Sequence, residues 1–507
     1  GERRRSRAEI DQLKQTLLAD TNLDYRRDIQ PWLGEEITWA VTTPDIDRDR
    51  QNGSQPGYLL AVTTKNAERS REFLQLFWQK QATAGSDLVF EQYKGVKLVY
   101  SNKPLEGDLR GSLLQKGENT GSSLRNSLAS AVVGDRFVVF ANNPKVLRDA
   151  INNVQANNLN LSDSDSYKLA LQNLTQPKIG LTFLNLPAIG KWLGNDPIVQ
   201  ASEAGSQKYE SLAIALGLTP QGLVAETSLL TTAERQNNAT APTLSQPVGA
   251  LQYLPETSTL VAASTNLNQL WNQISVELRS SALSQVLDQY RASLENSWGI
   301  DLPQDVFSWV QGEYALGMLP GRDRTNPDWI FVAEKSPGAT EASIEHLDTV
   351  AKARGFSVGT LPLGNQSITG WTKLITAPVV PGEEKSGMKL EAQVQGVHTT
   401  AGKYEIFATS VEAMDKALKA PENSMLASAN FKGAIAPLPL PNDGYLYIDW
   451  ASSQPILERQ LPIFRVVELI GKPLFSNLRS LTVSSYGSDT GVQRSKVFFK
   501  LGAAPKT

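Results

Sequence analysis

The feature that most constrains the fold is an internal repeat whose period is about the size of a domain. Residues 28–35 (Asp-Ile-Gln-Pro-Trp-Leu-Gly-Glu) recur, with one extra residue, at 305–313. Further matches follow in the same order along the chain: 137–141 with 404–408, 167–168 with 431–432, 180–185 with 444–449, and 212–230 with 481–499. This fixed order predicts two tandem copies of one module.

The module boundaries follow from the repeat and from composition. A single core stops growing near about 250–300 residues, so a chain of 507 residues divides into several domains. We predict a first module at 1–232, a linker at 233–246 and a second module at 247–507. The linker contains Asn-Asn-Ala-Thr-Ala-Pro, a polar, proline-containing stretch that is typical of domain boundaries.

The two copies differ at their beginnings. The second copy starts with an apolar run at 259–263, and the first copy has no counterpart of this strand. We therefore expect the natural chain to continue N-terminally by at least about 30 residues, with Gly1 at a boundary or processing point. The alternative is that the first copy lacks the strand, which would leave a sheet edge open.

Apolar periodicity and turn residues predict the elements of one module. The expected helices begin at Asn66, at Thr340 in the second copy, and at Asn143-Pro144, which has an N-cap followed by proline. The expected buried stripes are Phe73, Leu76 and Phe77 in the first copy, and Ile344, Leu347 and Val350 or Ala351 in the second. Hairpins outnumber crossovers, so we predict an α+β fold with a mainly antiparallel sheet covered by helices on one face.

Composition excludes several kinds of chemistry. The chain has no cysteine, which excludes disulfides, thiolate nucleophiles and cysteine-bound metal. This absence fits an exported bacterial protein, and it fits a cytosolic one almost as well. The net charge of −3 provides no basic field for nucleic acid. No window of about 18 apolar residues is present to span a membrane.

Asp45, Asp47 and Asp49 alternate in a polar loop and resemble ligands of a hard cation. A calcium loop of this spacing also requires a well-placed glycine and a late bidentate glutamate, and both are missing. Arg48 and Arg50 also neutralise the loop. We therefore expect a solvated hairpin tip, with cation binding as the open alternative.

The remaining candidate residues have structural interpretations. Trp32 and Trp309 occupy the same point of both copies and are expected in the core rather than in a binding site. The run Arg3, Arg4, Arg5 and Arg7 is expected to be a solvated helix end, although beside an apolar segment it would suit an anionic membrane surface.

The two histidines provide little material for catalysis. His346 is expected on a helix surface and His398 on a strand, so they lie on different elements. No zincin, Walker, nucleophile-elbow or dinucleotide motif is present. We predict no catalytic, cofactor-binding or metal-binding residues, no cofactor and no enzymatic activity. The long polar loops at 101–125 and 375–390 are the first places to look for binding.

Three stretches carry a family resemblance: Leu-Asp-Tyr-Arg-Arg-Asp-Ile-Gln-Pro-Trp-Leu-Gly at 23–34, Pro-Gly-Tyr-Leu-Leu-Ala at 56–61, and Phe-Glu-Gln-Tyr-Lys-Gly-Val at 90–96. With them the chain resembles an uncharacterised cyanobacterial, membrane-anchored family catalogued as a domain of unknown function, DUF3352. The resemblance implies one N-terminal hydrophobic anchor and a soluble part in the periplasm or thylakoid lumen. It implies no catalytic or binding residues.

Three functions are compatible with these observations. The first is a non-enzymatic, membrane-tethered interaction, scaffold or assembly protein, whose partners would be membrane or envelope proteins. The second is a carrier of lipid or another apolar ligand, held between the sheet and its helices. The third is a hydrolase that uses a carboxylate pair.

Overall fold

The computed structural model describes residues 24–49, 55–83, 85–102, 128–156, 159–174, 178–193, 209–231, 244–271, 300–321, 327–378, 388–454, 477–489 and 491–502. The chain forms two compact units. Unit 1 is Gly1–Asp165 and unit 2 is Ser166–Thr507.

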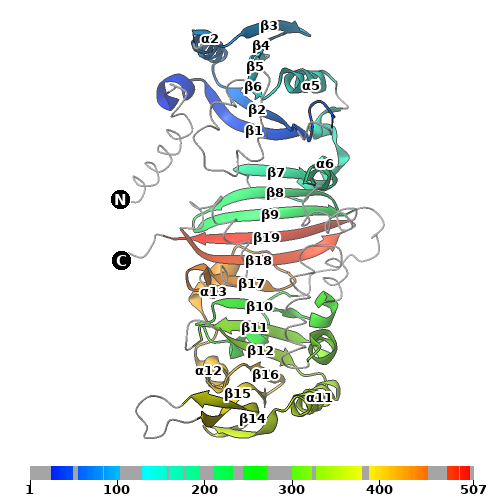
Figure 1. Cartoon of the computed structure of the whole chain (residues 1–507), viewed down its shortest axis with the longest axis vertical. Helices are drawn as coiled ribbons and strands as arrows, with labels where there is room; N and C mark the ends of the chain where they lie inside the picture. The colour runs from blue at the N-terminus through cyan, green and yellow to red at the C-terminus, as the bar shows by residue number, and fades with distance from the viewer. Residues whose placement is uncertain are drawn as a thin grey trace. The chain divides into compact units, whose positions relative to one another are not determined.

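Unit 1 is built on a six-stranded antiparallel sheet with the order β1-β2-β6-β5-β4-β3 (Figure 1). Its strands are β1 (Leu33–Thr43), β2 (Gly57–Thr64), β3 (Leu88–Tyr93), β4 (Val96–Ser101), β5 (Ala129–Val133) and β6 (Phe137–Ala141). A hairpin across Gly134 pairs β5 with β6, from Ala129↔Ala141 to Val133↔Phe137. The sheet is antiparallel throughout, as the sequence predicted.

Helices cover both faces of the unit 1 sheet. Helix α5 (Pro144–Gln155) packs on the face that carries Val139, and α2 (Ala67–Thr83) packs on the face that carries Val138. Adjacent residues of a strand point to opposite faces, and both valines are buried. The prediction of helices on one face only was therefore wrong.

The helix starts were predicted better than the helix faces. The Asn66 side chain accepts a hydrogen bond from the backbone N–H of Arg69 at 3.0 Å, which confirms the cap of α2. Asn143 caps α5 in the same way, with Pro144 as its first residue. The predicted stripe of α2 was wrong in part, because Leu76 is 58% exposed. The buried residues on this helix are Ser70, Leu74 and Trp78.

A partly exposed ion pair ties α5 to β3 in unit 1. Arg148 donates to both carboxylate oxygens of Glu91, at 2.8 and 2.7 Å. This pairing, together with a hydrogen bond from Tyr100, holds the pKa of Glu91 below its ordinary value of 4.5. A carboxylate with a lowered folded pKa stabilises the fold above its unfolded pKa, and this stability is lost as the pH falls through the folded value.

We expect Arg148→Met to weaken unit 1 at neutral pH by about 1 kcal/mol or less, because both side chains are partly solvated. The difference from the parent chain should shrink as the pH falls below 4.5 and Glu91 becomes protonated. Urea denaturation at a series of pH values measures this. A difference that stays constant through the acid range would contradict the assignment.

Unit 2 contains a thirteen-stranded antiparallel sheet with the order β13-β14-β15-β16-β12-β11-β10-β17-β18-β19-β9-β8-β7. The strands are β7 (Gly180–Asn185), β8 (Tyr209–Thr219), β9 (Gly222–Thr231), β10 (Leu260–Thr265), β11 (Glu313–Leu319), β12 (Asp328–Glu334), β13 (Ser357–Leu363), β14 (Gln366–Pro378), β15 (Met388–Ala401), β16 (Tyr404–Ala408), β17 (Tyr445–Asp449), β18 (Leu478–Asp489) and β19 (Val492–Leu501). Together the two antiparallel sheets and their helices confirm the α+β class.

The compact units differ from the predicted modules at 1–232 and 247–507. Strand β9 pairs with β19 from Gly222↔Lys500 to Leu230↔Val492, and green β9 lies beside red β19 in Figure 1. Strands β7 to β9 therefore belong to unit 2. Val492 also packs with Leu230 in one buried cluster. The expectation that each predicted module encloses its own interior was wrong.

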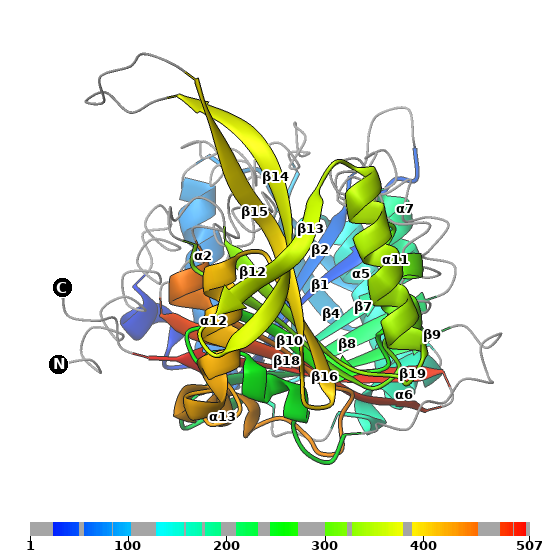
Figure 2. The same cartoon turned by 90° about the horizontal axis from the view of Figure 1, so that it is seen from below.

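The helices of unit 2 also lie on both sides of the strands. Helix α12 (Val411–Lys419) packs on the face that carries Ile330 and Val332, whereas α11 (Ala339–Ala353) packs on the opposite face. Figure 2 shows α12 and α11 on opposite sides of β12 and β16. Further helical segments among the described residues include α6 (Asp165–Gln172), α7 (Leu186–Leu193), α13 (Ala429–Ile435) and the short η3 (Leu161–Asp163), η7 (Phe307–Trp309) and η8 (Ala420–Glu422).

Helix α11 corrects one predicted cap. Its N-cap is Gly338 rather than Thr340, and the Gly338 N–H donates to the Glu341 carboxylate at 2.8 Å. Thr340 is buried in the first turn, where its hydroxyl accepts from the Ser336 N–H. Leu347 and Ala351 are buried as predicted.

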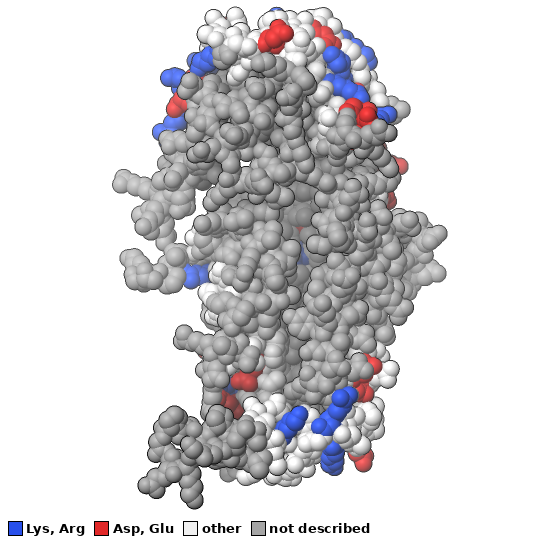
Figure 3. Space-filling model, in the orientation of Figure 1, with Lys and Arg blue, Asp and Glu red and all other residues white. Residues whose placement is uncertain are grey.

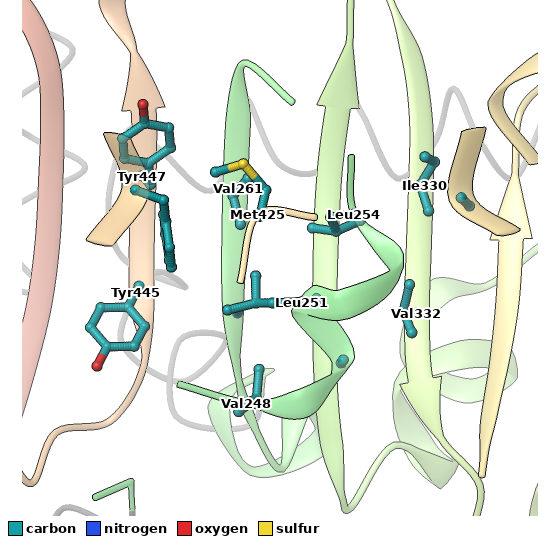
Figure 4. Close-up of a cluster of buried hydrophobic side chains, with 14 of the residues drawn as sticks. Val248, Leu251, Leu254, Val261, Ile330, Val332, Met425, Tyr445 and Tyr447 are labelled. Atoms are coloured by element: carbon teal, nitrogen blue, oxygen red, sulfur yellow. The ribbon is translucent and has the colours of Figure 1, made fainter. Parts of the chain in front are cut away.

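The largest buried cluster forms where a short helical turn, η5 (Gly249–Tyr253), covers the middle of the sheet. Figure 4 shows Leu251 of η5, and Leu254 directly after it, beside the strands that carry Val261 (β10) and Ile330 (β12). Both leucines are fully buried. The cluster joins segments that are far apart in the sequence, because residues of η5 pack with residues of β10 and β12, the two neighbours of β11 in the sheet.

Tyr447 in the same cluster resists ionisation. Burial, with a smaller contribution from the charge of Asp449, raises its pKa from 10.0 to about 12. The folded state therefore favours the neutral phenol, so this stability is fully present below pH 10.0 and is lost as the pH rises toward about 12.

We expect Tyr447→Phe to make the chain less sensitive to alkaline unfolding between pH 10 and 12. Phenolate absorbance in pH-jump experiments should show one fewer slowly titrating tyrosine in the variant. Tyr314→Phe serves for comparison, since burial also raises that pKa to about 12. Rapid titration of every tyrosine in the folded parent would contradict the prediction.

Candidate functional site

The aspartate loop uses its carboxylates to shape the chain. Asp45 Oδ1 accepts from the backbone N–H of Gln55 at 3.2 Å, and Asp47 Oδ1 accepts from that of Asp49 at 2.9 Å. Asp47 and Asp49 are exposed. Across the described residues, no cluster of three histidine, cysteine or carboxylate side chains is placed to hold a metal ion. In the described part of the loop these two carboxylates therefore hold the backbone, whereas residues 50–54 lie outside the described residues.

Trp32 and Trp309 occupy equivalent local structures in the two units. Each follows a π-helical turn, η1 (Tyr25–Ile29) or η6 (Leu302–Val306), and each is buried. The indole N–H of Trp32 donates to the carbonyl of Asp28 at 2.8 Å, and that of Trp309 to the carbonyl of Asp305 at 3.2 Å. The structure therefore confirms the expectation that both rings lie in the core.

Other predicted sites fall partly or wholly outside the described residues. Arg3, Arg4, Arg5 and Arg7 lie outside them, as does almost all of the first long loop (101–125) and the middle of the second (375–390). His346 is described: its side chain is 58% exposed and lies 3.3 Å from a carboxylate oxygen of Asp305. This confirms its expected place on a helix surface.

The sequence analysis missed a buried polar cluster around His398. Nδ1 of His398 lies 3.1 Å from Glu405 on β16, and Nε2 lies 3.2 Å from Asp348 on α11. Asp348 also accepts from the indole N–H of Trp371 at 2.7 Å, and Glu405 accepts from the Thr400 hydroxyl at 2.6 Å. The His398 side chain is only 6% exposed and that of Glu405 only 2%. We call these five residues the His398 cluster.

The hydrogen bonds of the His398 cluster connect a helix to the sheet on which it packs. Ionised carboxylates only accept hydrogen bonds, so both contacts form together when both ring nitrogens of His398 carry protons. A ring engaged at both nitrogens has neither free to exchange a proton with a bound molecule. The ring also stacks on Phe407, with centroids 5.6 Å apart. The cluster links helix α11 to strands β14, β15 and β16.

Unit 1 has a simpler polar tie between its helix and its sheet. The indole N–H of Trp78 on α2 donates to the hydroxyl of Ser130 on β5 at 2.7 Å. Both groups are buried. In each unit, a polar bond in an apolar interface thus fixes the position of a helix on strands that are distant in sequence.

The most unusual surface in unit 1 is the outward edge of its sheet. Among the described strands, β1 pairs only with β2. Its odd-numbered residues include Ile37, Trp39 and Val41, which are 61%, 64% and 36% exposed. Trp39 stacks on Tyr58 of β2, with centroids 5.9 Å apart, so its ring is supported by the neighbouring strand. We call Ile37, Trp39 and Val41 the β1 row.

A second apolar surface lies beside α13 in unit 2. An open groove of about 460 Å³ is lined by Pro247, Leu426, Phe431, Lys432 and Ile435. Phe431 forms its floor and is itself buried, whereas Lys432 is exposed. Volumes of about 300–1,000 Å³ are usual for small-molecule sites. This groove lies outside the packed core that the second functional hypothesis had pointed to.

The described surface carries charges of both signs. Figure 3 shows lysine and arginine side chains interspersed with aspartate and glutamate. Within the described residues, no helix has the length and apolar character needed to cross a membrane.

Comparison with known proteins gives a family match over almost the whole chain. A family model described as "Protein of unknown function (DUF3352)" matches residues 1–501. No curated protein and no solved structure matches the chain. Because the match covers far more than half of the residues, the chain belongs to the DUF3352 family.

Proposed function

We propose that this chain is a non-enzymatic interaction protein, tethered to a membrane on its extracytoplasmic side, that acts as a scaffold or assembly factor for membrane or envelope proteins. The resemblance to an anchored cyanobacterial family supports the tether and the compartment, the periplasm or the thylakoid lumen. The β1 row supports the interaction role.

The β1 row is the observation that carries the proposal. An exposed β-strand edge presents unpaired backbone N–H and C=O groups, and natural proteins usually protect such an edge with charges, proline or a covering element. On β1 the exposed side chains include the isoleucine, tryptophan and valine of the β1 row, beside Glu35 and Glu36 at the start of the strand. Contiguous apolar surface of this kind marks a site for association. Trp39 at its centre is the residue type that most often dominates binding energy.

A photo-crosslinking experiment tests the interaction role. A photoreactive phenylalanine analogue is placed at Trp39, in the chain as it occurs in its native membranes. Leu76 is a matched control, because it is similarly exposed at 58% but lies on helix α2. We expect a discrete protein adduct from position 39 and none from position 76. Identical adducts at both positions, or none at either, would sink the proposal.

The groove beside α13 supports a second candidate function, the binding of an apolar ligand. Four of its five lining residues are apolar, and Lys432 at its rim is suited to an acidic headgroup. We expect a fluorescent fatty acid to bind the full chain and Ile435→Asp to weaken binding at least about tenfold, because the ligand would then face a desolvated charge. Leu440→Asp, at an exposed position outside the lining residues, is the control. Equal binding by both variants would exclude the groove.

A further inference from the structure

We infer that strands β9 and β19 of unit 2 form a binding site for a small molecule that carries one carboxylate group. The site consists of Glu226 and Ser228 on β9 with Arg494 and Lys496 on β19. We call these four residues the β19 polar patch. The inference concerns unit 2 alone and does not depend on the proposed interaction role.

The β19 polar patch occupies one face of two paired strands. Arg494 lies opposite Ser228, and Lys496 lies opposite Glu226. Alternate residues of a strand share a face, so the four side chains leave the sheet on the same side. Opposite Cβ atoms in such a pair are about 5 Å apart, and alternate residues along a strand are about 7 Å apart. The polar groups of the patch are therefore close enough to meet at one small ligand.

The patch interrupts a buried face that is apolar on either side of it. In one direction along the strands, Val224 and Phe498 belong to the large cluster that includes Phe431 of α13. In the other direction, Leu230 and Val492 belong to the cluster that includes a residue of α6. Apolar side chains of similar size are often at least as stabilising as buried charges. Packing alone therefore gives no reason for charged residues between these two clusters.

The patch contains more positive than negative charge. Lys496 is only 5% exposed, although it carries an ammonium group. The Arg494 guanidinium lies over the ring of Tyr486, 5.3 Å from its centroid, and the Tyr486 hydroxyl donates to the buried Glu226 carboxylate at 2.8 Å. The patch thus sets two cations against one carboxylate. Burial of an unbalanced charge is unfavourable, and one bound monoanion would balance it.

The patch also holds hydrogen-bond donors that lack an acceptor. The Ser228 hydroxyl and the Nε of Arg494 are buried without a hydrogen-bond partner among the described residues. Buried polar groups are almost always satisfied, so such groups point to a bound ion, ligand or water. A carboxylate only accepts hydrogen bonds and has about four acceptor positions. It could therefore satisfy both donors and contact the Lys496 ammonium.

The charge of the patch selects among anions. A phosphate monoester carries a charge of about −1.5 to −2 at pH 7, which is more than the single excess positive charge of the patch. The Glu226 carboxylate would repel the additional negative charge. Arg494 is partly exposed, so a small ligand can approach the patch from its side. These features favour a monoanionic carboxylate over a phosphate.

Sodium acetate is the probe, added to the full chain at constant ionic strength with sodium chloride as the balancing salt. A ligand that binds only the folded state raises the melting temperature, and we expect a saturable rise of at least about 2 °C. Acetamide, which has a similar shape without the charge, should give no rise, and methyl phosphate should give a smaller one. If acetate gives no rise beyond that of chloride, the inference is overturned and internal water or an adventitious ion satisfies the donors.

Variants of the patch locate the binding. Lys496→Met removes the charge and keeps a long side chain, so without acetate it should melt at the parent temperature or above. It should also lose the acetate response. Ser228→Ala removes one donor and should weaken acetate binding about threefold or more. Lys500→Met is the matched control, because Lys500 lies on the same face of β19 four residues farther along, and it should respond as the parent chain does.

Two results would contradict this assignment of the site. One is an acetate response that persists in folded Lys496→Met. The other is equal acetate affinity in Ser228→Ala and Lys500→Met, a comparison that still decides the question if Lys496→Met fails to fold.

Discussion

Replacing His398 with alanine is expected to lower the free energy of unfolding of unit 2 by about 3–5 kcal/mol, because breaking a buried charged cluster on one side leaves its partners uncompensated. The carboxylates of Glu405 and Asp348 both face His398, at 3.1 and 3.2 Å. Without the imidazole, both carboxylates would lose their contact with a ring nitrogen. They would remain beside Trp371 and Phe407, the aromatic neighbours of the ring.

The chain contains a matched control for this prediction. His346, the other histidine, is 58% exposed and contacts only one carboxylate among the described residues. His346→Ala should cost about 1 kcal/mol or less, as is usual for exposed pairs. Urea denaturation of the full chain measures both variants, and hydrogen exchange of β15 and β16 locates the effect. Equal losses for the two histidines would show that the His398 cluster is not a stabilising tie.

Replacing Trp309 with alanine should cost a similar amount, about 3–5 kcal/mol, through lost burial and the cavity that remains. The ring is 2% exposed and packs with Phe407, at a centroid distance of 6.4 Å. It also closes the turn before β11 through its hydrogen bond to the Asp305 carbonyl. Trp309→Phe keeps part of the packing and removes the bond, so a smaller loss of about 1–2 kcal/mol is expected.

Trp39 provides the comparison for Trp309, because it is the same residue type at 64% exposure. Trp39→Ala should change stability by about 0.5 kcal/mol or less, as surface substitutions usually do. Thermal and urea denaturation of Trp309→Ala, Trp309→Phe and Trp39→Ala measure the three losses of stability. A loss for Trp39→Ala as large as that for Trp309→Ala would mean that the β1 row is covered in solution.

The predictions from sequence succeeded where the interactions are local. The caps at Asn66 and Asn143 were identified because a side-chain oxygen near the start of a helix satisfies a backbone N–H two or three residues away. The hairpins β5–β6 and β8–β9 also carry a local signal, because Gly134 and Gly222 stand at their turns with positive φ. The burial of Trp32 and Trp309 also followed from their repeated local context.

Helix faces were harder to predict, because a short apolar set fits more than one stripe. Phe73, Leu76 and Phe77 share helical spacing, yet Leu76 is exposed and Leu74 and Trp78 are buried. The sequence-based prediction also missed that helices cover both faces of each sheet. Val138 and Val139 are both buried, and such a continuous apolar run is the signal of a strand covered on both sides.

The candidate sites depended still more on tertiary structure. The two carboxylates of the His398 cluster come from α11 and β16, which flank the histidine at sequence separations of 50 and 7 residues. Nothing in the spacing marks Asp348 as a partner. Only the sheet order shows that β1 has one described neighbour where β11 has two.

The sequence by itself determined the α+β class, the positions of most described strands, the helix starts at Asn66 and Asn143 and the exclusion of cysteine chemistry, because these depend on composition and on contacts between residues close in the chain. Only the tertiary structure decided that β9 joins β19, that helices cover both faces, and that β1 pairs with one neighbour among the described strands. Strand edges pair according to which edges meet in space. Glu226 and Lys496 are opposite each other in one ladder, and no local pattern records a pairing over that distance.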